Sequence, residues 1–143
     1  MNGRLDLSDL FFSGDGRVDR VPFIAASAVL VLLLAAYQRL VAGHPAVHWT
    51  TGLFAYGFLV FASACVLSKR LHDRGRSGWW SLVIMICFAG VWPYPASVKD
   101  WLATAVLVWA FVELALMPGQ PWPNRFGARM APLDPGESAQ TPA

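Results

Sequence analysis

The chain has 143 residues, of which 56% are hydrophobic and only 14% are charged, and its net charge is +2. Soluble domains carry about 25% charged residues, so this composition indicates a single-domain integral membrane protein. The small net charge gives no support for nucleic acid as a partner.

The N-terminal segment, residues 1–20, reads "MNGRLDLSDLFFSGDGRVDR". It has acidic residues among its first charges and no apolar stretch before a small-residue cleavage site, so we do not expect a signal peptide. We expect a polar cytoplasmic segment that is retained in the protein. Its last part carries Arg17 and Arg20 next to the first apolar run.

Four apolar segments follow, each about 17–20 residues long, which is close to the length that crosses a ~30 Å hydrocarbon core. None shows a polar face at the 3.6-residue period, so they are not surface helices. The sequence therefore predicts an all-α fold, a bundle of four transmembrane helices within residues 21–117. Their predicted ranges are 21–40, 49–67, 79–98 and 101–117.

The third segment is the least regular of the four. Pro93 and Pro95 interrupt its end, and proline is poorly tolerated inside a helix. Two alternatives stay open for this segment, a span that tilts little or crosses a thinned bilayer, and a re-entrant hairpin.

The distribution of Lys and Arg predicts the topology. Nine of the 11 basic residues lie before the first, between the second and third, and after the fourth apolar segment. The positive-inside rule places those three stretches, and both termini, in the cytoplasm. Tryptophans at the segment ends suit the aromatic belt of a membrane interface. Residues 129–143, rich in Pro, Ser, Gly and Ala, are expected to be a disordered tail.

Three short polar stretches at the cytoplasmic ends hold most of the candidate site residues. They read "FFSGDGRVDR" (11–20), "KRLHDRGRSGWW" (69–80) and "MPGQPWPNRFG" (117–127), and each combines glycine, arginine and an aromatic residue. Glycines permit turns and arginines supply planar forks of donors. The candidates for lipid or partner binding are Arg17, Arg20, Arg70, His72, Asp73, Arg74, Arg76, Trp79, Trp80, Asn124 and Arg125.

These stretches resemble a family of small bacterial inner-membrane proteins, the domain-of-unknown-function family 805. The middle motif is "RLHDRGRSGWW" (70–80), the last is Pro118–Gly119 followed by "NRFG" (124–127), and the first, Gly16–Arg17, matches in part. The resemblance covers residues 11–128. It implies a four-helix membrane domain of the bacterial inner membrane, with residues 118–128 as a cytoplasmic motif, and implies no activity.

The middle loop has a functional and a structural interpretation. Its arginines are suited to anionic headgroups, because juxtamembrane basic clusters attract anionic lipid. In the structural interpretation the charges only set topology, Asp73 pairs with a neighbouring arginine, and Ser77 caps the third helix. Gly75 and Gly78 then form the turn.

Catalysis and metal binding have little support in the sequence. His72 and Asp73 are adjacent but lack a nucleophile and further ligands, so an enzyme using them is the weakest hypothesis. His44 and His48 flank Pro45 and make only two ligands, and Cys65 and Cys87 lie in apolar runs as expected inert thiols. We expect no cofactor and no metal site.

Glu113 is the only ionisable residue well inside a predicted span, which makes it a functional candidate. It could snorkel, be protonated, or pair with a basic residue of the middle loop. The leading hypothesis is a non-enzymatic membrane protein that binds membrane lipids, with anionic headgroups as candidates, or a protein partner, including a second copy. The alternative is a small oligomeric transporter or channel that uses Glu113.

Overall fold

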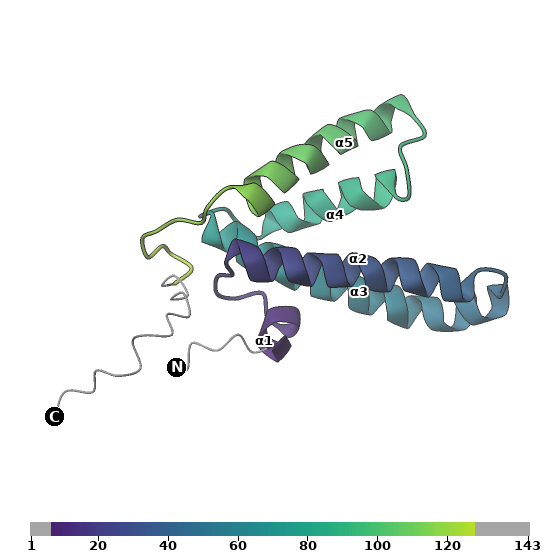
Figure 1. Cartoon of the computed structure of the whole chain (residues 1–143). Helices are drawn as coiled ribbons and strands as arrows, with labels where there is room; N and C mark the ends of the chain where they lie inside the picture. The colour runs from purple at the N-terminus through teal and green to yellow at the C-terminus, as the bar shows by residue number, and fades with distance from the viewer. Residues whose placement is uncertain (1–6, 128–143) are drawn as a thin grey trace.

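The computed structural model describes residues 7–127, and within them the fold is all-helical, as predicted (Figure 1). Arg4, Arg129 and the predicted tail 129–143 lie outside the described residues. The elements are α1 (Leu7–Phe12), α2 (Arg20–Val41), α3 (Pro45–Asp73), α4 (Trp79–Val91), α5 (Val98–Phe111) and the π-helix η1 (Val112–Leu116).

The helices form two hairpins that meet at one end (Figure 1). The first pairs α2 with α3, the second pairs α4 with α5, and η1 continues α5 to the meeting point. Helices α2 and α3 are 22 and 29 residues long and apolar enough to cross a membrane by length and composition. At 1.5 Å per residue their axes measure about 33 Å and 44 Å.

The helix bounds differ from the predicted ranges most at the ends of α3 and α4, and α3 and α5 also begin earlier than predicted, at Pro45 and Val98. Helix α3 runs on to Asp73, so the first part of the middle motif is helical rather than loop. Helix α4 ends at Val91, short of the predicted 98, because Trp92 is extended and Pro93 and Pro95 follow it. Its 13 residues measure only about 20 Å, less than the hydrocarbon core.

Helix α5 begins at a cap that the proline-rich connection supplies. The carboxylate of Asp100 accepts the backbone N–H groups of Ala96, at 2.9 Å, and Ser97, at 2.7 Å. Asp100 is the third residue of α5, so it satisfies donors at the start of the helix as part of a capping box with Ser97. The early start of α5 and the early end of α4 are therefore consequences of one short turn.

The helices expose apolar side chains and bury polar ones at one end. Only 17% and 22% of the apolar windows of α2 and α3 are buried, and Trp49, Leu53 and Phe54 are each at least 78% exposed. The buried charged residues are Arg17, Lys69, Arg70, Asp73 and Glu113. An apolar exterior of this extent is expected at a membrane or a partner, and it is rare on a soluble monomer.

Helix α1 is an element that the predicted cytoplasmic segment 1–20 did not include. It packs against α3 through Phe12, whose ring centroid lies 6.0 Å from that of Phe58 and 6.4 Å from that of Phe61. The carboxylate of Asp9 forms an ion pair with Lys69, whose side chain is only 3% exposed. Helix α1 therefore lies against the C-terminal half of α3.

Candidate functional site

The three polar stretches come together where the two hairpins meet (Figure 1). We call this assembly the polar clasp and define it as residues 14–20, 69–80 and 113–127. Its last part, residues 117–127, is named the strap. Hydrogen bonds between residues more than 35 positions apart join all three stretches.

Asp73 is the centre of the polar clasp. Its Oδ1 accepts hydrogen bonds from Arg17 Nε at 3.0 Å and Nη2 at 2.8 Å, and its Oδ2 accepts one from Arg70 Nη1. The side chains of all three residues are 1% exposed or less. One carboxylate therefore bridges two buried guanidinium groups, and such an ion set needs its other donors satisfied to be tolerated away from water.

The remaining donors of both arginines bind backbone carbonyl groups. Arg17 Nη1 donates to Trp122 O at 3.0 Å, and its Nη2 donates to Gln120 O. Arg70 donates through Nε to Leu114 O and through Nη2 to Met117 O, both at 2.7 Å. The last carbonyls of a helix have no partner within it, so Arg70 caps the end of η1 while Arg17 holds the strap.

The strap is also bound directly to the end of α3. Gln120 N–H donates to the backbone carbonyl of Asp73 at 2.9 Å, and Asn124 Nδ2 donates to that of His72 at 2.9 Å. Gly119 faces the Asp73 carboxylate so closely that a Cβ there would lie 1.8 Å from Oδ2. Within the described residues, every buried side-chain nitrogen and oxygen has a hydrogen-bond partner.

His72 has a positioning role in this arrangement. Its Nδ1 is 3.3 Å from Gly16 O and must donate to it, which leaves Nε2 to face Ser68 Oγ at 3.4 Å. The ring stacks on Phe126, with centroids 3.8 Å apart and planes 7° from parallel. The Asp73 carboxylate binds Arg17 and Arg70 and does not bind His72. His72 and Asp73 therefore do not form the acid–base pair that the enzyme hypothesis would need.

Glu113 adopts one of its three predicted alternatives, the ion pair with the middle loop. Its Oε1 accepts Arg74 Nη2 at 2.9 Å and Arg76 Nε at 3.3 Å. The Arg76 guanidinium lies over the Trp109 ring, 5.1 Å from its centroid. The π-helix buries Glu113 just after the end of α5, within the polar clasp.

The structure divides the predicted binding residues into buried and accessible ones. Direct ligand binding does not fit Arg17, Arg70 and Asp73, because their side chains are inaccessible and bound to one another. His72, Arg74 and Asn124 are partly buried and engaged in the contacts described above. The accessible ones are Arg20, Arg76, Trp79, Trp80 and Arg125.

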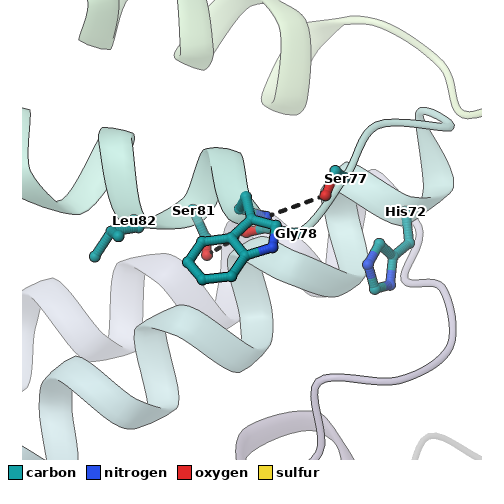
Figure 2. A pocket seen from close by; sticks show the side chains of 6 residues that line it. His72, Ser77, Gly78, Ser81 and Leu82 are labelled. Carbon is teal, nitrogen blue, oxygen red and sulfur yellow. Dashed lines mark hydrogen bonds between the residues drawn. The ribbon is translucent and has the colours of Figure 1, made fainter.

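Two further details correct or extend the sequence interpretation. Gly78, not Ser77, is the N-cap of α4, and the Ser77 hydroxyl accepts only a long 3.5 Å bond from Trp79 N–H (Figure 2). The pair Asp9–Lys69 was missed, because Asp9 lies outside the three polar stretches. Among residues 7–127 no group of three His, Cys, Asp or Glu side chains could hold a metal ion.

Comparison with known proteins gives a family and two relatives. The family model described as "Protein of unknown function (DUF805)" matches residues 11–128. "Uncharacterized protein YiiR" of Escherichia coli K12 is 29% identical over 136 residues, which cover 86% of this chain and 89% of that protein. "Inner membrane protein YhaH" of Escherichia coli K12 is 37% identical over 73 residues, 50% of this chain and 46% of that protein. No solved structure matches.

Proposed function

The chain belongs to the DUF805 family of proteins of unknown function, and from that premise we propose that it is a non-enzymatic inner-membrane protein whose cytoplasmic face binds anionic lipid headgroups. The printed name of the relative YhaH, an inner membrane protein, supports the location. The apolar exterior of α2 and α3 supports it independently, since side chains this exposed and apolar suit lipid.

In the proposed topology α2, α3, α4 and α5 with η1 all cross the membrane, and both termini are cytoplasmic. Nine of the 11 basic residues then lie on the cytoplasmic side. The short α4 is accommodated by local thinning of the bilayer beside it. The polar clasp would lie at the cytoplasmic surface, so its charged residues would be outside the hydrocarbon core.

The topology is tested by cysteine accessibility in a background in which Cys65 and Cys87 are alanine. We expect Asp15→Cys to react with a membrane-impermeant maleimide only after the inner membrane is opened. Ala42→Cys, in the turn between α2 and α3, should react in intact spheroplasts, because that turn would face the periplasm. Labelling of both cysteines from the same side would contradict the proposal.

The charge of the polar clasp is the observation that carries headgroup binding. Its three stretches hold seven basic side chains and four carboxylates, those of Asp15, Asp19, Asp73 and Glu113, which leaves a surplus of three positive charges. Arg20 and Arg125, two of the basic residues, are exposed, as are Trp79 and Trp80. Phosphate is a suitable counter-charge because guanidinium groups bind it in bidentate geometry, and tryptophan favours headgroup depth.

The charge proposal predicts a loss of headgroup preference when exposed arginines are neutralised. In nanodiscs of phosphatidylglycerol and phosphatidylethanolamine, the Arg20→Gln, Arg125→Gln double variant should retain phosphatidylglycerol more weakly by up to about 2 kcal/mol, since each exposed basic side chain contributes about 1 kcal/mol. Native mass spectrometry measures the retained lipids. Arg39→Gln, at the opposite end of α2, is the matched control and should behave as wild type.

The same native mass spectra show whether a protein partner or a second copy of the chain is bound. A double variant that retains the same lipids as wild type would refute headgroup binding, and a co-extracted second chain would favour a protein partner or a homo-oligomer. The transporter alternative draws no support from Glu113, whose carboxylate is bound by Arg74 and Arg76 at the clasp.

A further inference from the structure

A groove runs beside the polar clasp, between α3, the start of α4 and the N-terminal loop. One part of it, about 440 Å³, is lined by His72, Ser77, Gly78, Trp79, Ser81 and Leu82 (Figure 2). A second part, about 290 Å³, is lined by Gly14, Phe61, Ala64, Cys65, Ser68 and Ser81. Ser81 lines both parts, so they adjoin at this side chain.

The α3 wall of the groove follows one face of the helix. Phe61, Ala64, Cys65, Ser68 and His72 recur at spacings of three, one, three and four residues, which places them in a single stripe. The stripe extends over 11 residues, about 16 Å along the axis. Its middle members have small side chains, and this leaves the space open.

The groove lies between a basic residue and exposed apolar side chains. His72 lies at one end of the row of side chains in Figure 2 and Leu82 at the other. Arg125 does not line the groove but lies over the ring of Phe126 at 4.6 Å, and that ring stacks on His72. Away from His72, the two parts are lined by Phe61, 51% exposed, and Leu82, 49% exposed. An anionic head and an apolar tail would match these two ends.

We propose that the groove between α3 and α4 binds the acyl chain of one anionic phospholipid from the cytoplasmic leaflet. The phosphate lies at the Arg125 end and the chain lies over the small side chains of α3. This inference rests on the proposed membrane topology, which puts the groove at headgroup depth and makes lipid its neighbour. An acyl chain fits the groove because it would fill the space beside Ala64 and Cys65 and make dispersion contacts with them.

Filling the groove tests the proposal. Ala64→Phe places a ring in the space that the acyl chain would take, and Ala89→Phe, on an exposed position of α4 outside the groove, is the matched control. Purified protein is titrated with dioleoyl phosphatidylglycerol and examined by native mass spectrometry. We expect one tightly held lipid on wild type and on the control, and binding about tenfold weaker for Ala64→Phe.

A second measurement needs no variant, so it stands even if Ala64→Phe does not fold. Cys65 lines the groove, and Cys87, on α4 outside it, is an internal reference. Dioleoyl phosphatidylglycerol should slow the reaction of Cys65 with methyl methanethiosulfonate several-fold more than it slows that of Cys87. Cys65 is 6% exposed, so its reaction is followed over hours and compared with and without lipid. A Cys65 rate that the lipid leaves unchanged would overturn the groove as a lipid site.

The outcomes separate this inference from the proposed headgroup function. Groove filling should weaken phosphatidylglycerol and phosphatidylcholine alike, because the tail is common to both. Neutralised arginines should lower only the preference for phosphatidylglycerol over lipids without a net negative charge, phosphatidylethanolamine and phosphatidylcholine. If the variant with neutralised arginines loses its preference for phosphatidylglycerol and still holds one lipid, the headgroup and groove proposals are both supported. Equal lipid retention by Ala64→Phe and wild type would overturn the groove alone, and a dimer that Ala64→Phe dissociates would assign the groove to a second copy.

Discussion

Replacing Asp73 by asparagine is expected to lower the free energy of unfolding by about 3–5 kcal/mol, the usual cost of removing one partner from a buried ion pair. The change keeps the shape of the side chain and removes its charge. Arg17 and Arg70 would then remain buried, with side chains 1% and 0% exposed, and without the carboxylate that binds both. Thermal unfolding of the purified protein in detergent, followed by circular dichroism, measures the loss.

The control for this experiment is Asp15→Asn. Asp15 is exposed, and within residues 7–127 its carboxylate forms no ion pair with a buried cation, so its replacement should cost about 0.5 kcal/mol or less. Similar unfolding temperatures for the two variants would mean that the Asp73 carboxylate does not hold the clasp together. The comparison therefore isolates the buried ion pairs, since both variants exchange an aspartate for an asparagine.

Gly119→Ala is expected to destabilise the protein by about 3 kcal/mol, at the upper end of the range for overpacking. The added methyl group would lie 1.8 Å from Oδ2 and 2.5 Å from Cγ of Asp73. The carboxylate cannot move aside, because Arg17 and Arg70 bind its two oxygens. The strap must move instead, which would break its hydrogen bonds from Arg17 and to the Asp73 carbonyl.

Limited proteolysis and thermal unfolding together measure this effect. We expect trypsin to cleave after Arg125, an exposed residue of the strap, several-fold faster in Gly119→Ala than in wild type, as a displaced strap opens more often. The matched control is Gly14→Ala, because a Cβ at Gly14 meets nothing within 4 Å and its φ is not positive. Wild-type stability and cleavage rate in Gly119→Ala would show that the strap does not need this close approach.

The all-helical class was predictable from the sequence because long apolar segments are visible in the order of the residues. The helix ends were less predictable. Helix α4 stops at Val91 because the prolines after Trp92 cannot continue it, and the sequence showed those prolines. The extension of α3 to Asp73 was missed, since charged residues such as Lys69 and Arg70 looked like a loop and are in fact buried against α1 and η1.

The site was predictable as a set of motifs and not as an arrangement. The middle motif and the strap were both identified, and Asp73 was expected to pair with a neighbouring arginine, as it does with Arg70. The second partner, Arg17, lies 56 residues away, and nothing in the sequence around Asp73 indicates that these two residues pair. Arg17 and Arg125 had the same predicted role, yet one is buried and the other exposed.

The sequence by itself determined that the chain is helical and apolar, with its basic residues gathered in three stretches, because composition, hydrophobic length and charge position are properties of the chain as written. Only the tertiary structure decided which charges are internal. Burial of Arg17, Arg70 and Asp73 depends on two hairpins meeting at one end, and on backbone carbonyls of the strap that no side-chain pattern encodes. A buried charge is tolerated only where all its partners arrive together, and that condition belongs to the folded chain.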